Sequence, residues 1–278
     1  MFTSNLSILL ATYNSVKFLE SQIESLLNQT YTGFTIYVHD DGSTDNTVEI
    51  LRSYAASHSN IVLLEDATHA RGAMRSFMWM LEHVEADYYM FCDHDDVWLP
   101  QKIELSLGKM REIETVNTPA MVFTNLKVVD GELNVIAESM WGYEKLRPAY
   151  LSQLKFAVTK NIFTGCTMLF NNSAKQVSLP LSPKALMHDS WVGLKVLANA
   201  GVVGYVETPQ VLYRQHGNNV VGSVAIDNSF KYYLSKVTNF LSMLKKWRRI
   251  YEMSNCAIGK RTPFLQYYYW KFYYLIIR

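Results

Sequence analysis

Tyr88-Tyr89-Met90-Phe91-Cys92 runs directly into Asp93-His94-Asp95-Asp96, so a short apolar stretch ends in a cluster of carboxylates. The apolar run predicts a buried strand, and the carboxylates then follow where that strand surfaces. Residues i and i+2 of an extended chain project to the same side, so Asp93 and Asp95 can converge on one hard cation while Asp96 points elsewhere. The alternative is that these carboxylates cap the helix after Pro100 or lie solvated in a turn.

Two earlier predicted strands also end in polar residues. Residues 6–10 read as a buried strand followed by Ala11-Thr12-Tyr13-Asn14, and a strand over residues 34–39 runs into the acidic turn Asp40-Asp41-Gly42-Ser43-Thr44-Asp45. Glycine permits a tight turn there, and the Ser, Thr and Asp residues supply a helix cap. Ligands of open α/β sheets bind at the carboxyl ends of parallel strands, and an acidic turn suits a base or a ribose better than a bare phosphate.

The middle of the chain continues this alternation of strands and helices. Strands are predicted at 61–65, 88–92 and 121–123, and helices with an apolar face at 74–81 and 103–110. Alternation of this kind favours an α/β fold with a mainly parallel sheet and helices on both faces. Trp141 and Tyr143 lie in an irregular stretch, where they could stack on a sugar or serve as ordinary packing aromatics.

Composition fits an intracellular globular protein. The chain has 278 residues, 49% of them hydrophobic, which is enough for a substantial core. Its three cysteines are widely spaced and odd in number, which favours a reducing cytoplasm over a disulfide framework. The N-terminal apolar stretch is short and has no basic leader, so we expect no signal peptide.

A change in composition near residue 223 predicts two parts, 1–223 and a helical appendage, 224–278. The appendage carries ten basic and two acidic residues, a net +8, whereas the preceding part carries −7, and it holds 14 of the 37 aromatic residues. Basic residues among Tyr and Trp suit the surface of an anionic membrane. The alternatives are packing against the preceding part or against a second copy in a homo-oligomer. We do not expect nucleic-acid binding, because the acidic part would repel a polyanion, or a transmembrane helix, because residues 264–277 are too few.

The chain closely resembles the bacterial family 2 glycosyltransferases, and within them the rhamnosyltransferase-like members. Six motifs carry the resemblance in the family's order, over residues 6 to about 222: Ala11-Thr12-Tyr13-Asn14, Asp40-Asp41-Gly42-Ser43-Thr44-Asp45, Asp93-His94-Asp95-Asp96-Val97-Trp98, Thr164-Gly165-Cys166-Thr167, His188-Asp189-Ser190-Trp191 and Tyr213-Arg214-Gln215-His216-Gly217-Asn218-Asn219. The resemblance implies a GT-A fold, Rossmann-like, that transfers a sugar from a nucleotide diphosphate with inversion at the anomeric carbon.

The resemblance also implies a metal site. Its ligands would be Asp95, Asp93, which the ribose would share, and His216, and the ion would be Mn²⁺ or Mg²⁺ acting as a Lewis acid on the departing diphosphate. Asp189 is the candidate general base; the same motif also resembles a helix start, and a helix N-terminus favours an ionised carboxylate.

The donor would be linked to dTDP or UDP. Asp41 suits the acceptor of the base N3–H, Thr12 and Asn14 would contact the ribose or merely cap the turn, and Arg71 and Arg75 are candidate contacts for the diphosphate or the sugar. Two positions depart from the rhamnosyltransferase-like pattern, which usually has Asn near Ser76 and Asp near Asn125, so the donor sugar stays open.

The function that we predict is a metal-dependent inverting glycosyltransferase at the cytoplasmic face of the cell membrane. It would extend a surface polysaccharide or an O-antigen glycan on a lipid carrier, with rhamnose as one candidate sugar. Two alternatives remain: a haloacid dehalogenase-like phosphatase, whose D-x-D-x-[TV] pattern Asp93 to Val97 also fits, and a catalytically inactive carbohydrate-binding relative. No phosphate-binding G-x-x-x-x-G-K-[ST] motif occurs.

Overall fold

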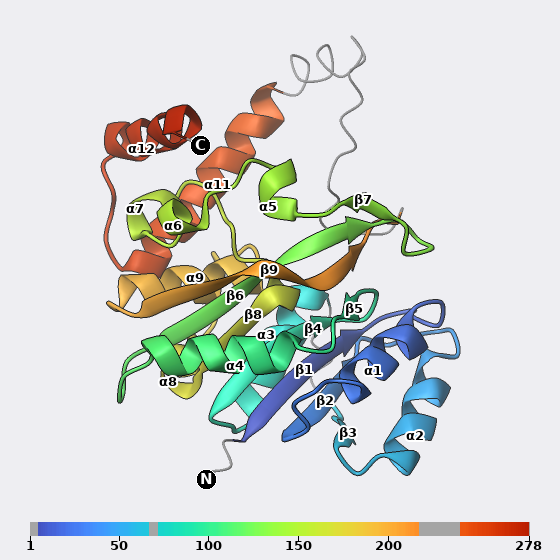
Figure 1. The fold of residues 1–278 in the computed structure, drawn as a ribbon. Helices are drawn as coiled ribbons and strands as arrows, with labels where there is room; N and C mark the ends of the chain where they lie inside the picture. Colours follow the sequence, from blue (N-terminus) through green and yellow to red (C-terminus); the bar gives the residue numbers. More distant parts are fainter. Residues whose placement is uncertain (1–4, 67–71, 217–239, 278) are drawn as a thin grey trace.

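The computed structural model describes residues 5–66, 72–216 and 240–277. Within these residues one nine-stranded sheet has the order β3-β2-β1-β4-β8-β6-β9-β5, and β7 pairs with β6 (Figure 1). The strands are β1 (Leu6–Thr12), β2 (Phe34–Asp40), β3 (Ile61–Leu63), β4 (Tyr88–Asp93), β5 (Val97–Trp98), β6 (Ala120–Val129), β7 (Val135–Ala137), β8 (Met168–Asn171) and β9 (Val202–Arg214).

The first half of the sheet is parallel. Strands β3, β2, β1 and β4 all run in one direction, and β8 is antiparallel to both of its neighbours, β4 and β6. Thr12 pairs with Asp40 across β1 and β2, and Ala11 pairs with Asp93 across β1 and β4. The three strands that precede the acidic and polar motifs therefore end at the same edge, as the sequence predicts.

Helices cover both faces of the sheet, which confirms the predicted α/β class. Strand β1 is buried throughout, and its alternate side chains enter two separate cores. Leu9 belongs to the core under α3 and α9, whereas Leu10 belongs to the core under α1, α2 and α4. The helices are α1 (Leu19–Leu27), α2 (Thr47–Ser57), α3 (Ala73–His83), α4 (Lys102–Ile113), α5 (Met140–Tyr143), α6 (Pro148–Leu151), α7 (Leu154–Ala157), α8 (Asn172–Ser178), α9 (His188–Ala198), α11 (Phe240–Ile258) and α12 (Phe264–Ile277), with a 3₁₀ turn at Gly165–Thr167.

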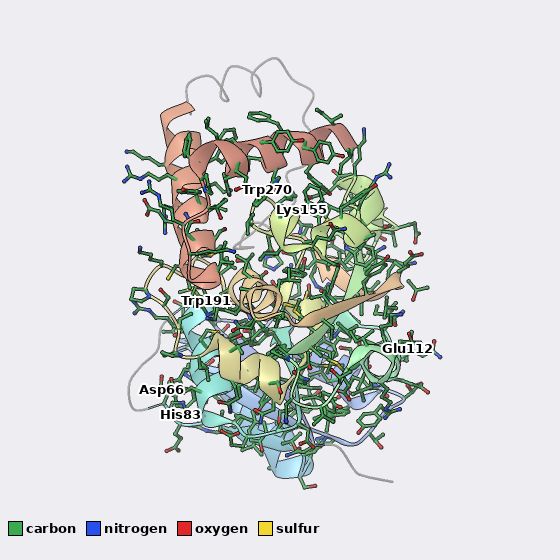
Figure 2. The ribbon with its side chains drawn as sticks, turned by 90° about the vertical axis from the view of Figure 1, so that its left-hand side faces the viewer. Asp66, His83, Glu112, Lys155, Trp191 and Trp270 are labelled. Atoms are coloured by element: carbon green, nitrogen blue, oxygen red, sulfur yellow. The ribbon has the colours of Figure 1, made fainter. Side chains whose placement is uncertain are left out.

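The two C-terminal helices pack on the rest of the chain. Helix α11 lies against α9 and α12 lies against α7, at the end of the molecule away from α2 (Figure 1). Figure 2 shows both helices from the side, with Trp270 on α12 and Lys155 on α7 labelled. Tyr267 and Tyr274 are buried in the same core as Phe156 of α7. The predicted boundary near residue 223 lies outside the described residues, so the division into two parts stays a prediction.

The packing of α11 and α12 is continuous with the core under α9. Ser254 of α11 donates a hydrogen bond to the Val158 carbonyl (3.0 Å), and the Arg147 amide donates one to the Tyr274 hydroxyl (3.2 Å). Among the described helices, none combines the length and the apolar character that crossing a bilayer requires.

Candidate active site

The acidic turn after β2 is held by Asp40. Its carboxylate accepts hydrogen bonds from the Ser43 amide (2.8 Å), the Ser43 hydroxyl (2.6 Å), the Gly42 amide (3.1 Å) and the Thr12 hydroxyl (2.9 Å). Gly42 has a φ of 82°, a left-handed conformation that side chains other than glycine rarely adopt. Asp40 therefore shapes the turn, and it leaves the next carboxylate, Asp41, directed at the cavity described below.

Three residues predicted to contact the nucleoside lie beside this turn. Thr12, Asn14 and Asp41 all line one cavity. The side-chain oxygen of Asn14 accepts from the Thr44 amide (2.8 Å), and Asp41 accepts from the Gly72 amide at the start of α3 (2.6 Å). The polar groups of Thr12 and Asn14 thus cap the turn, and their proposed contact with a ribose stays a prediction.

The carboxylates after β4 separate into two environments. Asp93 and Asp95 line the cavity, as the alternation in an extended chain predicts. Asp96 is fully buried instead, and its carboxylate accepts a hydrogen bond from the Arg214 amide of β9 (3.1 Å). Burial, followed by the charges of Asp95 and Asp189, raises the pKa of Asp93. Like charges crowded in a partly dehydrated site would be relieved by a cation.

His216 joins this group from the far end of the sequence. Its Nε2 lies 2.8 Å from the Asp95 carboxylate, and its ring stacks on Phe18, with 4.9 Å between ring centroids. The Arg214 guanidinium lies over the Phe18 ring, 4.6 Å from its centroid. It also donates a hydrogen bond to the Asp95 backbone carbonyl (2.8 Å). Phe18 and Arg214 therefore fix the orientation of Asp95 and His216.

These two supporting residues were not assigned a role from the sequence. The sequence indicates Phe18 only as an apolar position of the helix after β1. It indicates Arg214 only as one residue of the last motif. The available signal for Arg214 was its place in the same motif, two residues before His216. No local pattern indicates Phe18, because its partner lies almost 200 residues away.

Asp189 is the second residue of α9 and is 8% exposed. Its carboxylate accepts from the backbone amides of Ser190 and Gly165 and from the side chain of Asn161, and each of these hydrogen bonds favours the charged form. Burial outweighs them and raises the pKa of Asp189 to about 6. The residue is thus still ionised at neutral pH, and it is a stronger base than an ordinary aspartate.

His188 faces the core rather than Asp189. It is 3% exposed, lies 4.3 Å from the Phe77 ring and 4.7 Å from the Phe91 ring, and burial lowers its pKa to about 3. A Cβ at Gly165 would lie 2.5 Å from the His188 imidazole, so glycine is needed for this close approach. The helix start predicted at this motif is confirmed, and His188 packs as a neutral ring.

A second grouping of ligand atoms includes Asp93, which lines the cavity, and two residues that do not. Atoms of Asp93, Asp96 and Cys166 fall within 4.8 Å of one another. Burial raises the pKa of the Cys166 thiol, which keeps it protonated, and the Asp96 carboxylate is already engaged by the Arg214 amide. Metals bind the thiolate and not the thiol, and a hard divalent cation prefers oxygen ligands to sulfur, so this trio does not suit such an ion.

Most of the predicted site residues border one cavity of about 1500 Å³. Its walls come from the ends of β1 and β4, the first turn of α9, and helices α11 and α12. Asp41, Asp93, Asp95, Asp189 and His216 line it.

Other candidates lie elsewhere. Arg75 is exposed on α3 and is not among the lining residues, and Arg71 lies outside the described residues. Trp141 is buried against Phe123, which makes it a packing aromatic, and Tyr143 does not line the cavity. Asn125 also lies outside the cavity: its side chain donates to the Ser139 hydroxyl (2.7 Å).

The sequence model described as "Glycosyl transferase family 2" matches residues 7–177, more than half of the chain. The chain belongs to this family. It is therefore a glycosyltransferase, an enzyme that takes its sugar from a nucleotide sugar. The matched region contains the acidic turn and the Asp93–Asp96 cluster, whereas Asp189 and His216 lie beyond it.

Individual relatives agree with this assignment. The dTDP-rhamnosyl transferase RfbG of Shigella flexneri is 28% identical over 86% of this chain and 81% of its own length. The putative glycosyltransferase EpsE of Bacillus subtilis is 35% identical over 44% of this chain and 45% of its own. A crystal structure of S. aureus TarS 1-349 in complex with UDP-GlcNAc superimposes with a TM-score of 0.60 at 18% identity, over 84% of this chain and 65% of that one. The last likeness confirms the GT-A fold.

Proposed function

We propose that this glycosyltransferase transfers a sugar with inversion from a dTDP- or UDP-linked donor to a lipid-linked glycan, and that a divalent cation assists the transfer. The observation that carries the proposal is that one cavity is lined both by Asp93, Asp95 and His216 and by the buried carboxylate of Asp189. Transfer with inversion needs one group that stabilises the departing diphosphate and another that takes the proton of the incoming hydroxyl.

The proposed metal ligands are Asp93, Asp95 and His216. Carboxylate oxygens and an imidazole nitrogen are suitable ligands for Mn²⁺, and for Mg²⁺ where water completes the shell. A cation bound there would supply Lewis-acid stabilisation of the departing diphosphate. The raised pKa of Asp93 supports this reading, because its charge is costly without a cation. Arg214 and Phe18 hold Asp95 and His216 in place.

Asp189 is the proposed general base. Its oxygens accept hydrogen bonds from Gly165 and Ser190, which hold the carboxylate in one orientation. A base with a pKa of about 6 is ionised at neutral pH and accepts a proton more readily than a carboxylate with an ordinary pKa. The acceptor hydroxyl would give its proton to Asp189 as its oxygen attacks the anomeric carbon.

Asp41 is proposed to recognise the nucleobase. A carboxylate accepts the N3–H that both thymine and uracil present, which is why the proposal names dTDP and UDP. Thr12 and Asn14 would lie beside the ribose. The likeness to the dTDP-rhamnosyl transferase RfbG supports a dTDP donor and rhamnose as the sugar, and an O-antigen or another surface polysaccharide as the product.

The membrane contact is proposed for the outer face of α12. Six of the thirteen exposed large apolar side chains among the described residues lie on this helix: Phe264, Leu265, Tyr269, Phe272, Tyr273 and Ile276. Their spacing puts them on one side, while Tyr267 and Tyr274 bury the other. An exposed apolar face rich in aromatic rings suits a membrane interface, and neighbouring Lys and Arg residues suit anionic lipid. We therefore propose that the enzyme works at the cytoplasmic face of the cell membrane.

Donor hydrolysis tests the catalytic proposal. Wild-type enzyme is incubated with dTDP-rhamnose, dTDP-glucose, UDP-glucose and UDP-GlcNAc, each with Mn²⁺ and with excess chelator, and release of the nucleotide diphosphate is followed. We expect turnover of at least one donor with Mn²⁺ and loss of that turnover in chelator. Equal turnover in chelator would remove the metal from the proposal.

Vesicle co-sedimentation tests the membrane contact. The triple variant Leu265→Gln, Phe272→Gln, Ile276→Gln should sediment less with phosphatidylglycerol vesicles than wild type. A matched control places the same three changes at exposed apolar positions remote from α12: Val116→Gln, Val135→Gln, Ile136→Gln. Equal sedimentation of both variants would show that α12 is not the contact.

A further inference from the structure

The part of the cavity nearest the C-terminal helices is basic. Five cationic side chains line it, and a sixth residue, Trp247, supplies an aromatic wall. These cations come from α11, from α12 and from the segment between α7 and the 3₁₀ turn; we call them the basic arm: Lys160, Lys245, Lys246, Arg249 and Lys271. The acidic site residues come instead from the sheet edge and from α9. The cavity therefore has an acidic and a basic region built on different elements.

Lys271 is the innermost member of the basic arm. It is half-buried, donates a hydrogen bond to the Thr159 carbonyl (3.2 Å) and lies 4.9 Å from the centre of the Trp247 ring. Burial, followed by the charges of Lys160 and Lys246, lowers the pKa of Lys271. Cations that raise one another's energy in a shared cavity form a site suited to an anion.

Acidic side chains do not balance this charge. Among the described residues, the ion pair within the basic arm is Lys160 with Glu144 (3.1 Å), and Lys245, Lys246, Arg249 and Lys271 have no carboxylate partner. By contrast, Arg248 on the outer side of α11 is paired with Glu252 (2.8 Å) and does not line the cavity. The unbalanced cations are those that face the cavity.

We propose that the basic arm binds the diphosphate of a prenyl-diphosphate-linked acceptor, an inference that rests on the proposed function. The donor diphosphate belongs at Asp93, Asp95 and His216, so a second anionic group is needed to explain a second, basic region. A volume of about 1500 Å³ also exceeds the roughly 300–1,000 Å³ usual for one small ligand, which leaves room for two substrates.

The location of the basic arm favours the acceptor lipid over a membrane phospholipid. Lys271 lies on α12, the helix whose opposite face carries the exposed apolar residues, but it points inward to Thr159 and Trp247. A phospholipid headgroup in the bilayer plane would meet the outer face of α12, whereas a diphosphate that enters the cavity meets Lys271. The glycan attached to that diphosphate would then extend toward Asp189.

Binding of geranyl diphosphate, a soluble prenyl diphosphate, tests this proposal. Titration calorimetry is done on the full-length enzyme in EDTA, without vesicles, so that no metal can hold a diphosphate at Asp93 and Asp95. The variant Lys245→Gln, Lys246→Gln, Arg249→Gln should bind at least about tenfold more weakly than wild type. This weakening is smaller than the one expected when two charge-assisted contacts are removed. The control Arg248→Gln, Lys260→Gln, Arg261→Gln removes the same charge from exposed positions outside the cavity and should bind like wild type.

Three results would overturn the proposal. The first is equal weakening in both variants, which indicates a general effect of surface charge. The second is failure of inorganic diphosphate to compete with geranyl diphosphate, because the prenyl chain alone would then account for binding. The third is a variant of the basic arm that binds geranyl diphosphate like wild type but sediments less with phosphatidylglycerol vesicles. That result would assign the cations to lipid headgroups.

The donor-hydrolysis assay separates this proposal from the proposed function. The variant of the basic arm should hydrolyse the donor at the wild-type rate with Mn²⁺, since its three side chains do not form the donor site. Wild-type enzyme that hydrolyses a donor but does not bind geranyl diphosphate would overturn the inference alone. Enzyme that binds geranyl diphosphate but hydrolyses no donor would overturn the proposed function alone.

Discussion

Replacement of Asp189 by Asn should separate chemistry from binding. Asn keeps the size of the side chain and an oxygen that can accept from the Ser190 amide, but it cannot take a proton from the acceptor hydroxyl. With a pKa of about 6, wild-type Asp189 is mostly ionised at pH 7.5, the form that a general base needs. Loss of a general base lowers the rate by about 10²–10⁴, which is about 2.7–5.4 kcal/mol in activation free energy.

The fold of Asp189→Asn should survive. The pKa of Asp189 lies about two units above its ordinary value, so the folded state favours the neutral acid. As pH rises from about 4 to 6, the contribution of Asp189 to the free energy of unfolding therefore falls by about 3 kcal/mol. A neutral amide avoids that cost at pH 8, and this offsets the hydrogen bonds it loses, so we expect a Tm within a few degrees of wild type.

The assay measures single-turnover sugar transfer and donor affinity side by side. Asp189→Asn should bind the nucleotide diphosphate as wild type does and should show the loss only in the rate at saturating donor and acceptor. A folded variant with normal transfer at saturation, or one whose defect is confined to donor affinity, would refute the assignment of Asp189 as the base.

The remaining predictions concern the metal, the nucleobase and pH. Asp95→Ala should reduce Mn²⁺-dependent donor turnover at least about a hundredfold without unfolding, as judged by circular dichroism, and a fully active variant would contradict the metal site. Asp41→Asn should raise the KM for the donor about tenfold or more with little change in kcat, because it loses one charge-assisted hydrogen bond; a kcat effect alone would contradict this. Below about pH 6, kcat/KM should fall about tenfold per pH unit as Asp189 becomes protonated, and this limb should be absent in Asp189→Asn.

Much of the site was predictable because it is encoded locally. The apolar runs of β1 and β4, the turn at Gly42 and the helix start at His188 each depend on residues within a few positions of one another. Parallel strands end at a common edge, so the meeting of Thr12, Asp41 and Asp93 follows from the strand pattern. Domain boundaries and Arg71 fall outside the described residues, so those predictions are still open.

What required the structure is the distant partner that each of two neighbouring carboxylates meets. Asp95 and Asp96 are adjacent carboxylates, yet Asp95 faces His216 and Asp96 is buried under the Arg214 amide. Strand alternation separates these two carboxylates, but the partner that each meets about 120 residues away depends on how β9 packs beside β5 and β6, and no short-range pattern records that.

The sequence alone determined the α/β class, the family and the residues that end the parallel strands, because periodicity, turn residues and motif order are local properties of the chain. Only the tertiary structure decided that Asp189 is a buried carboxylate with a raised pKa, since desolvation depends on every element around it. It also decided that the basic C-terminal helices line the same cavity as the acidic sheet edge. Charge in a sequence shows how much is present, whereas packing decides which charges face each other.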